Sequence, residues 1–196
     1  MNVVVIRYGS GNIQSVLFAL QRIGVTPTLS SDPEVIAKAD KVIFPGVGEA
    51  SSTIKELKAS GLDKTITGLK QPFIGICLGL QLMCKHSEEG NVDCLGIFDL
   101  NVRKFISNDK ELKVPHVGWN TIQKLNGPLF RGIIENSFVY YVHSFYAEKG
   151  AETIAETNYI TPFSASLSKN NFHAVQFHPE KSGVVGETIL KNFIQL

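Results

Sequence analysis

The stretch that decides the fold is residues 73–79, Phe73-Ile74-Gly75-Ile76-Cys77-Leu78-Gly79. Residues 72–76 are typical of a buried β-strand, and the helical pattern of residues 78–86 starts directly after the cysteine. A G-x-C-x-G sequence between a strand and a helix predicts a sharp turn with a strained backbone at the cysteine. Side chains beside Cys77 would collide in such a turn, so glycine is expected at Gly75 and Gly79.

This turn gives Cys77 the surroundings of a nucleophile. The positive end of the following helix favours a thiolate over a thiol, and the N–H of Leu78 could hold a developing oxyanion. Hydrolases, peptidases and amidotransferases all use such a turn, so it does not by itself identify the reaction. Cys84 and Cys94 lack this context, and we interpret them as structural cysteines.

Strand and helix patterns alternate on both sides of the turn. Strand patterns occur at residues 2–6, 25–29, 41–44 and 72–76. Apolar residues at helical spacing lie between them, in residues 13–23 and around Ile54 and Leu57, and Gly24 suits the end of the first helix. Strands separated by helices in this order predict parallel β-α-β units.

The second part of the chain has a different pattern. Strand patterns follow one another at residues 96–105, 114–122, 138–147, 153–157 and 172–177, which indicates antiparallel additions to the sheet. Residues from 184 onward place their apolar side chains on one helical stripe, which we expect to pack on the sheet. We therefore predict a single α/β domain over residues 1–196. It would have three layers: a mostly parallel central sheet, with additional antiparallel strands, between flanking helices.

Composition limits the possible functions. The chain has 196 residues, 43% of them hydrophobic and 19% charged, which is typical of a globular domain with its own core. A net charge of +1 without a basic run argues against a nucleic-acid partner, and no apolar run is long enough for a signal peptide or a membrane span. Three cysteines without C-x-x-C spacing argue against disulfides and zinc. We expect a cytoplasmic protein without metal or cofactor.

A nucleophilic cysteine needs a base, and His178 stands out among the five histidines. It lies in the run Gln176-Phe177-His178-Pro179-Glu180. Residues two apart in an extended segment face the same side, so the Glu180 carboxylate could orient the His178 imidazole, and Pro179 would stiffen the link. An H-x-E pair is a weak motif alone, and the P-C-x-x-C of a zinc deaminase is absent. The pair gains meaning only together with Cys77.

Taken together, these motifs resemble the class I glutamine amidotransferases. Residues 75–81 are similar to the family's cysteine motif, residues 176–180 to its histidine motif, and Pro45-Gly46-Val47-Gly48 to its glycine loop. The order Cys, His, Glu is also the family's, and the resemblance covers essentially the whole chain. It implies a class I amidotransferase fold with a flavodoxin-like core.

The resemblance implies hydrolysis of the side-chain amide of glutamine. Cys77 would form a thioester, His178 would move the protons, and Glu180 would orient His178. The oxyanion would be held by the N–H of Leu78 together with that of Val47 or Gly48. The implied glutamine-binding residues are Gly46, Gln81, Glu89, His143, Ser144 and Phe145. Gln81 also follows Cys77 by four residues and therefore shares its helix face.

Further segments narrow the resemblance to the glutaminase subunits of imidazole glycerol phosphate synthases. They are residues 8–12, 115–120, 140–144 and 178–182. Such a subunit forms a heterodimer with a β/α-barrel cyclase and transfers ammonia to it by a route shielded from solvent. Ammonia that is free in neutral water is mostly protonated, and ammonium is not a nucleophile. Weak activity without the partner is also implied. The residues implied to face the cyclase are Asn12, Trp119, Asn120 and Lys181, although Trp119 could equally be core. The turn at residues 8–12 is not a nucleotide site, because Gln14 replaces the last glycine of that fingerprint.

Two positions depart from the family pattern, and three alternatives stay open. Arg7 stands where an acidic residue is usual, and Phe145 where a tyrosine is usual. The first affects the surface toward the partner, and the second affects one polar contact to substrate.

The alternative functions that stay open are the glutaminase of a related pair in sugar modification, a stand-alone cysteine hydrolase, and a non-catalytic interaction subunit.

Overall fold

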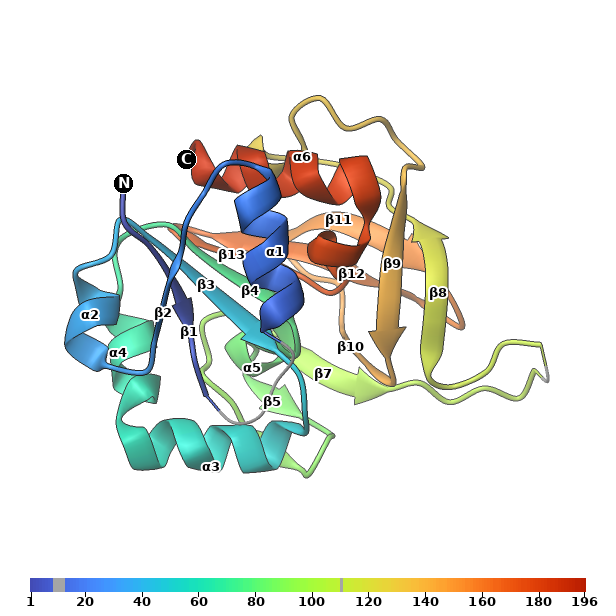
Figure 1. Ribbon diagram of the computed structural model, residues 1–196. Helices are drawn as coiled ribbons and strands as arrows, with labels where there is room; N and C mark the ends of the chain where they lie inside the picture. Colours follow the sequence, from blue (N-terminus) through green and yellow to red (C-terminus); the bar gives the residue numbers. More distant parts are fainter. Residues whose placement is uncertain (9–12, 110) are drawn as a thin grey trace.

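The centre of the molecule is a seven-stranded sheet with helices on both faces (Figure 1). The structure, a computed structural model, describes residues 1–8, 13–109 and 111–196. The strands of this sheet are β1 (Val3–Ile6), β2 (Thr28–Ser30), β3 (Lys41–Gly46), β4 (Phe73–Cys77), β11 (Thr153–Asn158), β12 (Pro162–Lys169) and β13 (Phe172–Val175). Their order is β11-β12-β13-β4-β3-β1-β2. The strands from β2 to β13 run parallel, and β12 and β11 add an antiparallel edge, which confirms the predicted fold class.

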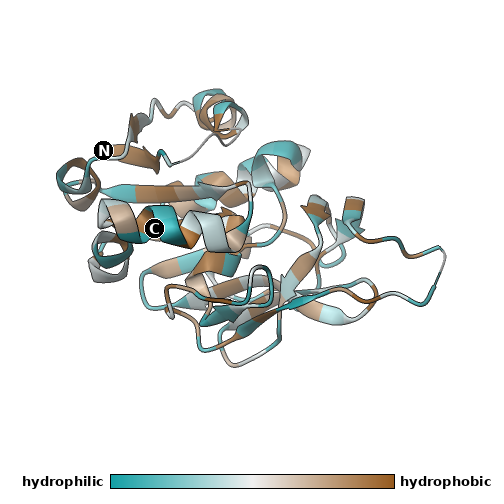
Figure 2. Ribbon diagram, turned by 90° about the horizontal axis from the view of Figure 1, so that it is seen from below, coloured by the Kyte–Doolittle hydropathy of each residue, from teal (hydrophilic) through white to brown (hydrophobic). Residues whose placement is uncertain are grey.

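Two hydrophobic cores, one on each face, make the predicted three layers. In β1, Val4 and Ile6 belong to one core, whereas Val3 and Val5 belong to the other. The first core is covered by α2 (Pro33–Ala37), α3 (Ala50–Ser60), α4 (Leu62–Gly68) and α5 (Leu78–Met83), and the second by α1 (Gln14–Arg22) and α6 (Gly183–Ile194). Figure 2 shows hydrophobic and hydrophilic residues on different sides of the helices, as expected for elements that cover a sheet.

The other strands form two smaller sheets, which corrects part of the prediction. One sheet has the order β10-β7-β5-β6 and consists of β5 (His86–Ser87), β6 (Val92–Asp93), β7 (Asn101–Lys104) and β10 (Phe145–Ala147). The second pairs β8 (His116–Thr121) with β9 (Phe138–His143) in antiparallel register. Two 3-10 helices, η1 (Pro128–Phe130) and η2 (Pro179–Lys181), complete the described elements. The strand patterns at residues 96–105, 114–122 and 138–147 therefore extend other sheets, not the main one.

Three further expectations about single elements were wrong. Strand β13, grouped with the antiparallel additions, is antiparallel to β12 but also pairs parallel with β4. The helix predicted for residues 78–86 ends at Met83, and His86 begins a strand. The strand predicted for residues 138–147 is interrupted at Ser144, between β9 and β10. Local patterns identify strands but not their partners, because pairing is decided by contacts between distant segments. Within the described ranges, no helix is long and apolar enough to cross a membrane.

Candidate active site

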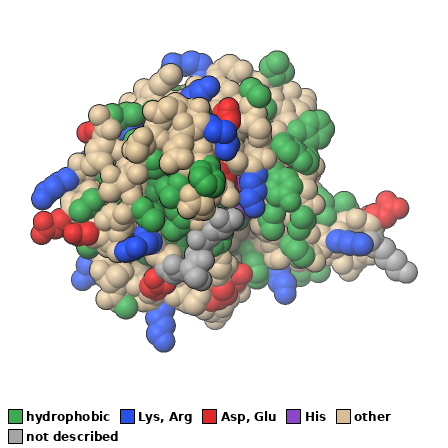
Figure 3. Space-filling model, viewed as in Figure 1, with side chains coloured by type: hydrophobic (Ala, Val, Ile, Leu, Met, Phe, Trp, Pro, Cys, Tyr) green, Lys and Arg blue, Asp and Glu red, His purple; other side chains and the backbone are tan. Residues whose placement is uncertain are grey.

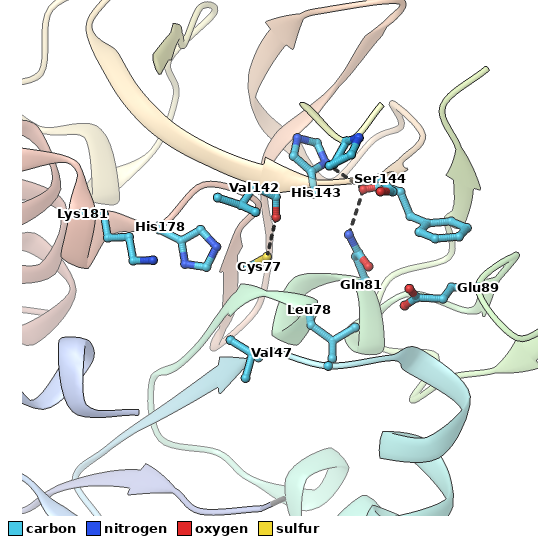
Figure 4. Close-up of a pocket in the computed structure, with 14 residues that line it drawn as sticks. Val47, Cys77, Leu78, Gln81, Glu89, Val142, His143, Ser144, His178 and Lys181 are labelled. Carbon is cyan, nitrogen blue, oxygen red and sulfur yellow. Dashed lines mark hydrogen bonds between the residues drawn. The ribbon is translucent and has the colours of Figure 1, made fainter. Parts of the chain in front are cut away.

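A cavity of about 400 Å³ opens at the carboxyl ends of strands β3 and β4. In an open α/β sheet this is where ligands bind. The cavity is lined by Gly46, Val47, Gly48, Cys77, Leu78, Gln81, Glu89, Pro115, Val142, His143, Ser144, Phe145, His178 and Lys181. The structure thus brings together the cysteine turn, the glycine loop and residues 143–145, as the sequence predicted (Figure 4). Pro115 and Val142 are additional lining residues to which the sequence had assigned no role.

Cys77 is held in a strained turn between β4 and α5. Its φ is 55° and its ψ is −109°, a conformation that non-glycine residues rarely adopt. A Cβ atom on Gly75 would lie 2.5 Å from Met83 Sδ and 2.8 Å from the carbonyl carbon of Gly79, and one on Gly79 would collide with the carbonyl oxygen of Phe44 on β3. Both glycines therefore have the steric role expected of them. Gly46 has a similar role that the sequence did not reveal, because its Cβ would collide with the turn itself.

His178 and Glu180 form a buried pair beside the cysteine. His178 Nδ1 lies 2.8 Å from Glu180 Oε1, with side-chain exposures of only 8% and 4%. Burial lowers the pKa of His178, but the charge and hydrogen bond of Cys77 and those of Glu180 outweigh it and raise the pKa to about 10. The imidazolium is therefore favoured at neutral pH, next to the sulfur that it would protonate or deprotonate.

The predicted contact between His178 and Glu180 is present, but its backbone geometry differs from the prediction. His178 is extended, with φ −98° and ψ 95°, whereas Pro179 begins the 3-10 turn η2. Proline at the first helical position has a suitable φ and no N–H to leave unsatisfied, so the turn forms here and swings Glu180 back to the ring. The His178 N–H donates to the Tyr140 carbonyl at 2.8 Å, and Ser182 Oγ donates to the His178 carbonyl at 2.7 Å. The backbone of His178 is thus fixed to strand β9.

Gln81 connects the helix after Cys77 to the opposite wall of the cavity. Its Nε2 donates to the Phe145 carbonyl at 2.8 Å and to Gln176 Oε1 at 3.0 Å. Gln176 is fully buried, and its Nε2 donates to Cys77 Sγ at 3.8 Å. The Cys77 sulfur also lies 3.8 Å from the Val142 carbonyl oxygen. Gln176 belonged to the motif around His178, yet its place next to the sulfur depends on tertiary contacts that no local pattern shows.

The two ends of the cavity differ in charge. Among the described residues that line the cavity, Glu89 is the only acidic one, and its Oε2 accepts the Ala50 N–H at the start of α3 at 2.9 Å. Burial raises the pKa of Glu89, and the neighbouring Glu49 acts in the same direction. In Figure 4, Glu89 lies beyond Gln81 on one side of Cys77, whereas His178 and Lys181 lie on the other. A small zwitterion could therefore place its ammonium near Glu89 and its reactive end at the sulfur.

The glycine loop after β3 rests on Tyr8. The Tyr8 hydroxyl donates to the Pro45 carbonyl at 2.7 Å. Burial raises the pKa of Tyr8 far above its usual value. Gly48 follows with a φ of +113°, a conformation that favours glycine. Val47, Gly48 and Leu78, predicted as oxyanion donors, all line the cavity, and Figure 4 shows Val47 and Leu78 on the same side of Cys77.

The residues predicted to face a partner have different environments. Trp119 is 55% exposed on β8, so it is not part of the core. Figure 3 shows hydrophobic side chains gathered over β8 and β9, and the exposed ones on these strands are Val117, Trp119, Phe138 and Val142. The Asn120 amide is engaged within the chain, donating to the Asn158 carbonyl at 2.9 Å. Lys181 lines the cavity, and Asn12 lies outside the described residues.

Comparisons with known proteins agree with this geometry. The model of the family Glutamine amidotransferase class-I matches residues 4–196. Relatives from Bacteroides thetaiotaomicron and Bacteroides fragilis, both described as "Imidazole glycerol phosphate synthase subunit HisH", are 59% identical over 196 residues, with 100% of each chain covered. A relative of the same description from Yersinia pestis is 44% identical over 198 residues, again with 100% of both chains covered.

Solved structures show the same fold at low sequence identity. A structure described as a glutamine amidotransferase superposes with a TM-score of 0.75 at 16% identity, covering 99% of this chain and 98% of that chain. A glutamine amidotransferase from Thermotoga maritima superposes with a TM-score of 0.64 at 17% identity, covering 99% and 80%. At these identities the structural likeness is an argument for the fold alone.

Proposed function

Because the chain belongs to the class I glutamine amidotransferases, we propose that it is the glutaminase subunit of an imidazole glycerol phosphate synthase, which releases ammonia from glutamine for histidine biosynthesis. The observation that carries this proposal is the strained Cys77 turn, which meets the buried His178–Glu180 pair in one cavity. The full-length similarity to proteins described as imidazole glycerol phosphate synthase subunits narrows the activity to this pathway. Residues 1–196 would act as one amidotransferase domain.

The reaction would begin with attack of the Cys77 thiolate on the amide carbon of glutamine. The carbonyl π-electrons move to oxygen, and when they return the C–N bond breaks. The His178 imidazolium protonates the departing nitrogen, so ammonia and a thioester result. The now neutral His178 then takes a proton from water, hydroxide attacks the thioester carbon, and the sulfur leaves as the thiolate. Glu180 holds the Nδ1 proton of His178 at 2.8 Å, which leaves Nε2 as the atom that exchanges protons.

We assign the oxyanion to the N–H of Leu78 at the start of α5 and to a second donor from residues 47–48. Removing one donor of this kind typically reduces turnover by about 10²–10³. Glu89 would hold the α-ammonium of glutamine by charge. Gly46, Gln81 and residues 143–145 would form the wall along the rest of the amino acid. The Phe145 carbonyl, held by Gln81 at 2.8 Å, is a main-chain group, so the replacement of tyrosine by phenylalanine at this position leaves it in place.

The partner would be a cyclase subunit with a β/α-barrel fold, joined to this chain in a heterodimer. The exposed hydrophobic side chains of β8 and β9 and the ring of Trp119 are suited to the centre of an interface. Lys181 lies between this surface and the cavity, with its Nζ 6.0 Å from the centre of the Tyr140 ring. Asn12 and Asn120 would be further contacts to the cyclase. A covered route from Cys77 to the cyclase would keep ammonia unprotonated.

The experiment that tests this function measures glutamate release from glutamine by the chain alone and with a cyclase subunit plus its phosphoribosyl ligand. We expect strong release only with the liganded partner, and none from Cys77→Ala. Cys94→Ala, which removes a half-buried thiol that does not line the cavity, serves as the matched control. Equal release with and without the partner would indicate a stand-alone hydrolase or another acceptor. No release by the wild type with its cognate cyclase would refute the proposal.

A further inference from the structure

A line of hydrogen-bonded polar groups leads from strand β8 to the cavity wall. Asn120 Nδ2 lies 3.3 Å from His116 Nε2, His116 Nδ1 lies 3.0 Å from His143 Nε2, and His143 Nδ1 lies 2.7 Å from the Phe145 carbonyl oxygen. His116 and His143 are directly opposite each other in the β8–β9 register. We call Asn120, His116 and His143 the histidine bridge. Its inner end is the same carbonyl that Gln81 holds from helix α5 at 2.8 Å.

The direction of every hydrogen bond in the histidine bridge follows from its two ends. A backbone carbonyl only accepts, so His143 Nδ1 carries a proton and donates it to Phe145. Nε2 of a neutral His143 is then an acceptor, so His116 donates from Nδ1 and accepts at Nε2. Asn120 Oδ1 accepts the Thr121 N–H at 2.7 Å, which leaves the Asn120 amide nitrogen as the donor to His116. Both rings therefore have the Nδ1–H tautomer.

The surroundings of the histidine bridge favour two uncharged rings. His116 stacks on Tyr159 with ring centres 3.9 Å apart, and His143 packs against Phe105 and Phe163 at 5.3 and 5.2 Å. Burial lowers the pKa of His116 to about 4. Burial also lowers the pKa of His143, to about 3. The hydrogen bond to the Phe145 carbonyl acts to raise this pKa, whereas the nearby His116 and His178 lower it further. A proton on Nε2 of His143 would point at the Nδ1–H of His116, and a proton on Nε2 of His116 would point at the Asn120 amide N–H, so the hydrogen bonds of the bridge require both rings to be neutral.

We infer that His116 and His143 are positioning residues for glutamine, acting through the Phe145 carbonyl and not by contact with the reacting atoms. Two donors from opposite sides, His143 on β9 and Gln81 on α5, fix this carbonyl and with it the backbone that links β9 to β10. The same bridge ties that backbone to β8, which carries the exposed Trp119. This inference rests on the proposed function, because it concerns the binding of glutamine.

The test compares His143→Phe with His143→Asn in the complex with the cyclase and its ligand. Phenylalanine keeps a ring against Phe105 and Phe163 but has no donor for Phe145. Asparagine places an amide nitrogen where histidine carries Nδ1. We expect His143→Phe to raise KM for glutamine about 5–10-fold with less than about twofold change in kcat, because one hydrogen bond to a binding element is lost. His143→Asn should recover most of this loss, and His116→Phe should raise KM about 2–5-fold through the weakened bridge.

Tyr141→Phe is the matched control, because it removes another buried hydrogen bond of the same strand, to Thr157 Oγ1 at 2.6 Å, and keeps the ring that packs against His116 and His143. Its KM should equal that of the wild type. Unchanged KM in His143→Phe, or equal losses in His143→Phe, His143→Asn and Tyr141→Phe, would overturn the inference.

The tautomers of His116 and His143 test the inference without a variant and without an activity assay. Long-range ¹H–¹⁵N spectra of the wild-type chain at pH 7 should show both rings neutral with the proton on Nδ1. A proton on Nε2 of either ring, or a charged ring, would refute the inference even if glutamine hydrolysis is normal. Conversely, an intact bridge in a chain that never hydrolyses glutamine with its cyclase would refute the proposed function alone.

Discussion

Three cysteines in this chain occupy three different environments. Cys84 is fully buried, and burial raises its pKa well above the usual value. Burial, aided by Asp93, raises the pKa of Cys94 to about 12. Cys77 alone lines the cavity and faces a histidine held in its charged form. Since only the thiolate reacts with alkylating agents, the surroundings of each sulfur decide its reactivity.

We therefore expect brief treatment with iodoacetamide at pH 7 to label Cys77 at least about tenfold faster than Cys94, since a thiol loses about a factor of ten in thiolate per pH unit below its pKa. Peptide mass spectrometry after a short exposure measures the three rates separately. Loss of glutaminase activity should follow the labelling of Cys77 in time. Faster labelling of Cys94, with activity retained, would contradict the assignment of the nucleophile.

The His178–Glu180 pair predicts a particular dependence of stability on pH. The pKa of His178 is raised from 6.5 to about 10, so its contribution to stability is complete below pH 6.5 and is lost as the pH rises to about 10. Glu180→Gln removes one cause of the raised pKa. Urea denaturation should show a deficit of roughly 2 kcal/mol in the free energy of unfolding of the variant at pH 6, as for a charge-assisted hydrogen bond. This deficit should shrink toward pH 10.

Glu187→Gln is the control for this measurement, because Glu187 pairs with Arg22 at the surface and has no histidine partner among the described contacts. Its difference from the wild type should stay constant between pH 6 and pH 10, since arginine keeps its charge over that range. A Glu180→Gln deficit that is equally constant would mean that His178 does not carry the raised pKa.

At the scale of elements, the position of Cys77 depends on how closely helix α5 approaches strand β3. A Cβ on Gly79 would collide with the Phe44 carbonyl, a backbone group that cannot move aside as a flexible side chain would. Gly79→Ala should therefore cost about 1–3 kcal/mol in the free energy of unfolding, as overpacking does, and lower kcat by displacing the turn. Chemical denaturation and the glutaminase assay measure the two effects.

Gly68→Ala provides the comparison, because nothing lies within 4 Å of the position where its Cβ would be, and its φ is not positive. Exchange of glycine for alanine at the end of a helix should change stability by less than about 1 kcal/mol, in the stabilising direction. If both variants behave alike, the close contact between α5 and β3 is not what fixes the turn.

Some strands could be predicted from the sequence and others could not. The strands β1, β3 and β4 were predicted within about two residues, the usual uncertainty of boundaries, because each is a continuous apolar run next to a turn. Strand β12 was missed: Ser164 and Ser166 alternate with Phe163, Ala165 and Leu167, and all five side chains are buried. Serines at buried positions hide the usual contrast between an inner and an outer face.

At the scale of the whole molecule, the surface over β8 and β9 predicts how the chain associates. Trp119→Ala should weaken binding to the cyclase subunit by about 2 kcal/mol or more, as loss of an exposed aromatic anchor typically does. Isothermal titration calorimetry measures the change. The melting temperature of the isolated chain should not fall, because the ring is 55% exposed and contributes little to the core.

Leu29→Ala is the matched control for association. Leu29 is 39% exposed on β2, which lies at the edge of the sheet away from β8 and β9 (Figure 1). Binding of this variant should equal that of the wild type. Unchanged binding of Trp119→Ala as well would place the contact with the cyclase elsewhere on the molecule.

The site could be predicted from the sequence as far as its residues belong to short motifs. Cys77, His178 and Glu180 were recognisable because the turn and the H-x-E pair are local. Tyr8, Gln176 and His116 were not, because each acts on a residue far away in the chain: Tyr8 on Pro45, Gln176 on Cys77, and His116 on His143. Such contacts are fixed by the packing of the sheets, for which a single sequence offers no period or motif.

The order of strands in the main sheet has a consequence for co-translational folding. Strand β4, which carries the nucleophile, pairs on one side with β13, and Cys77 and Gln176 are separated by 99 residues. While the chain is being synthesised, one edge of β4 therefore stays open until the late arrival of β13, with unpaired N–H and C=O groups in an apolar strand. Open edges of this kind promote aggregation. Premature termination before β13 should thus yield insoluble fragments, and the demand for chaperones should be greatest while the middle of the chain is emerging.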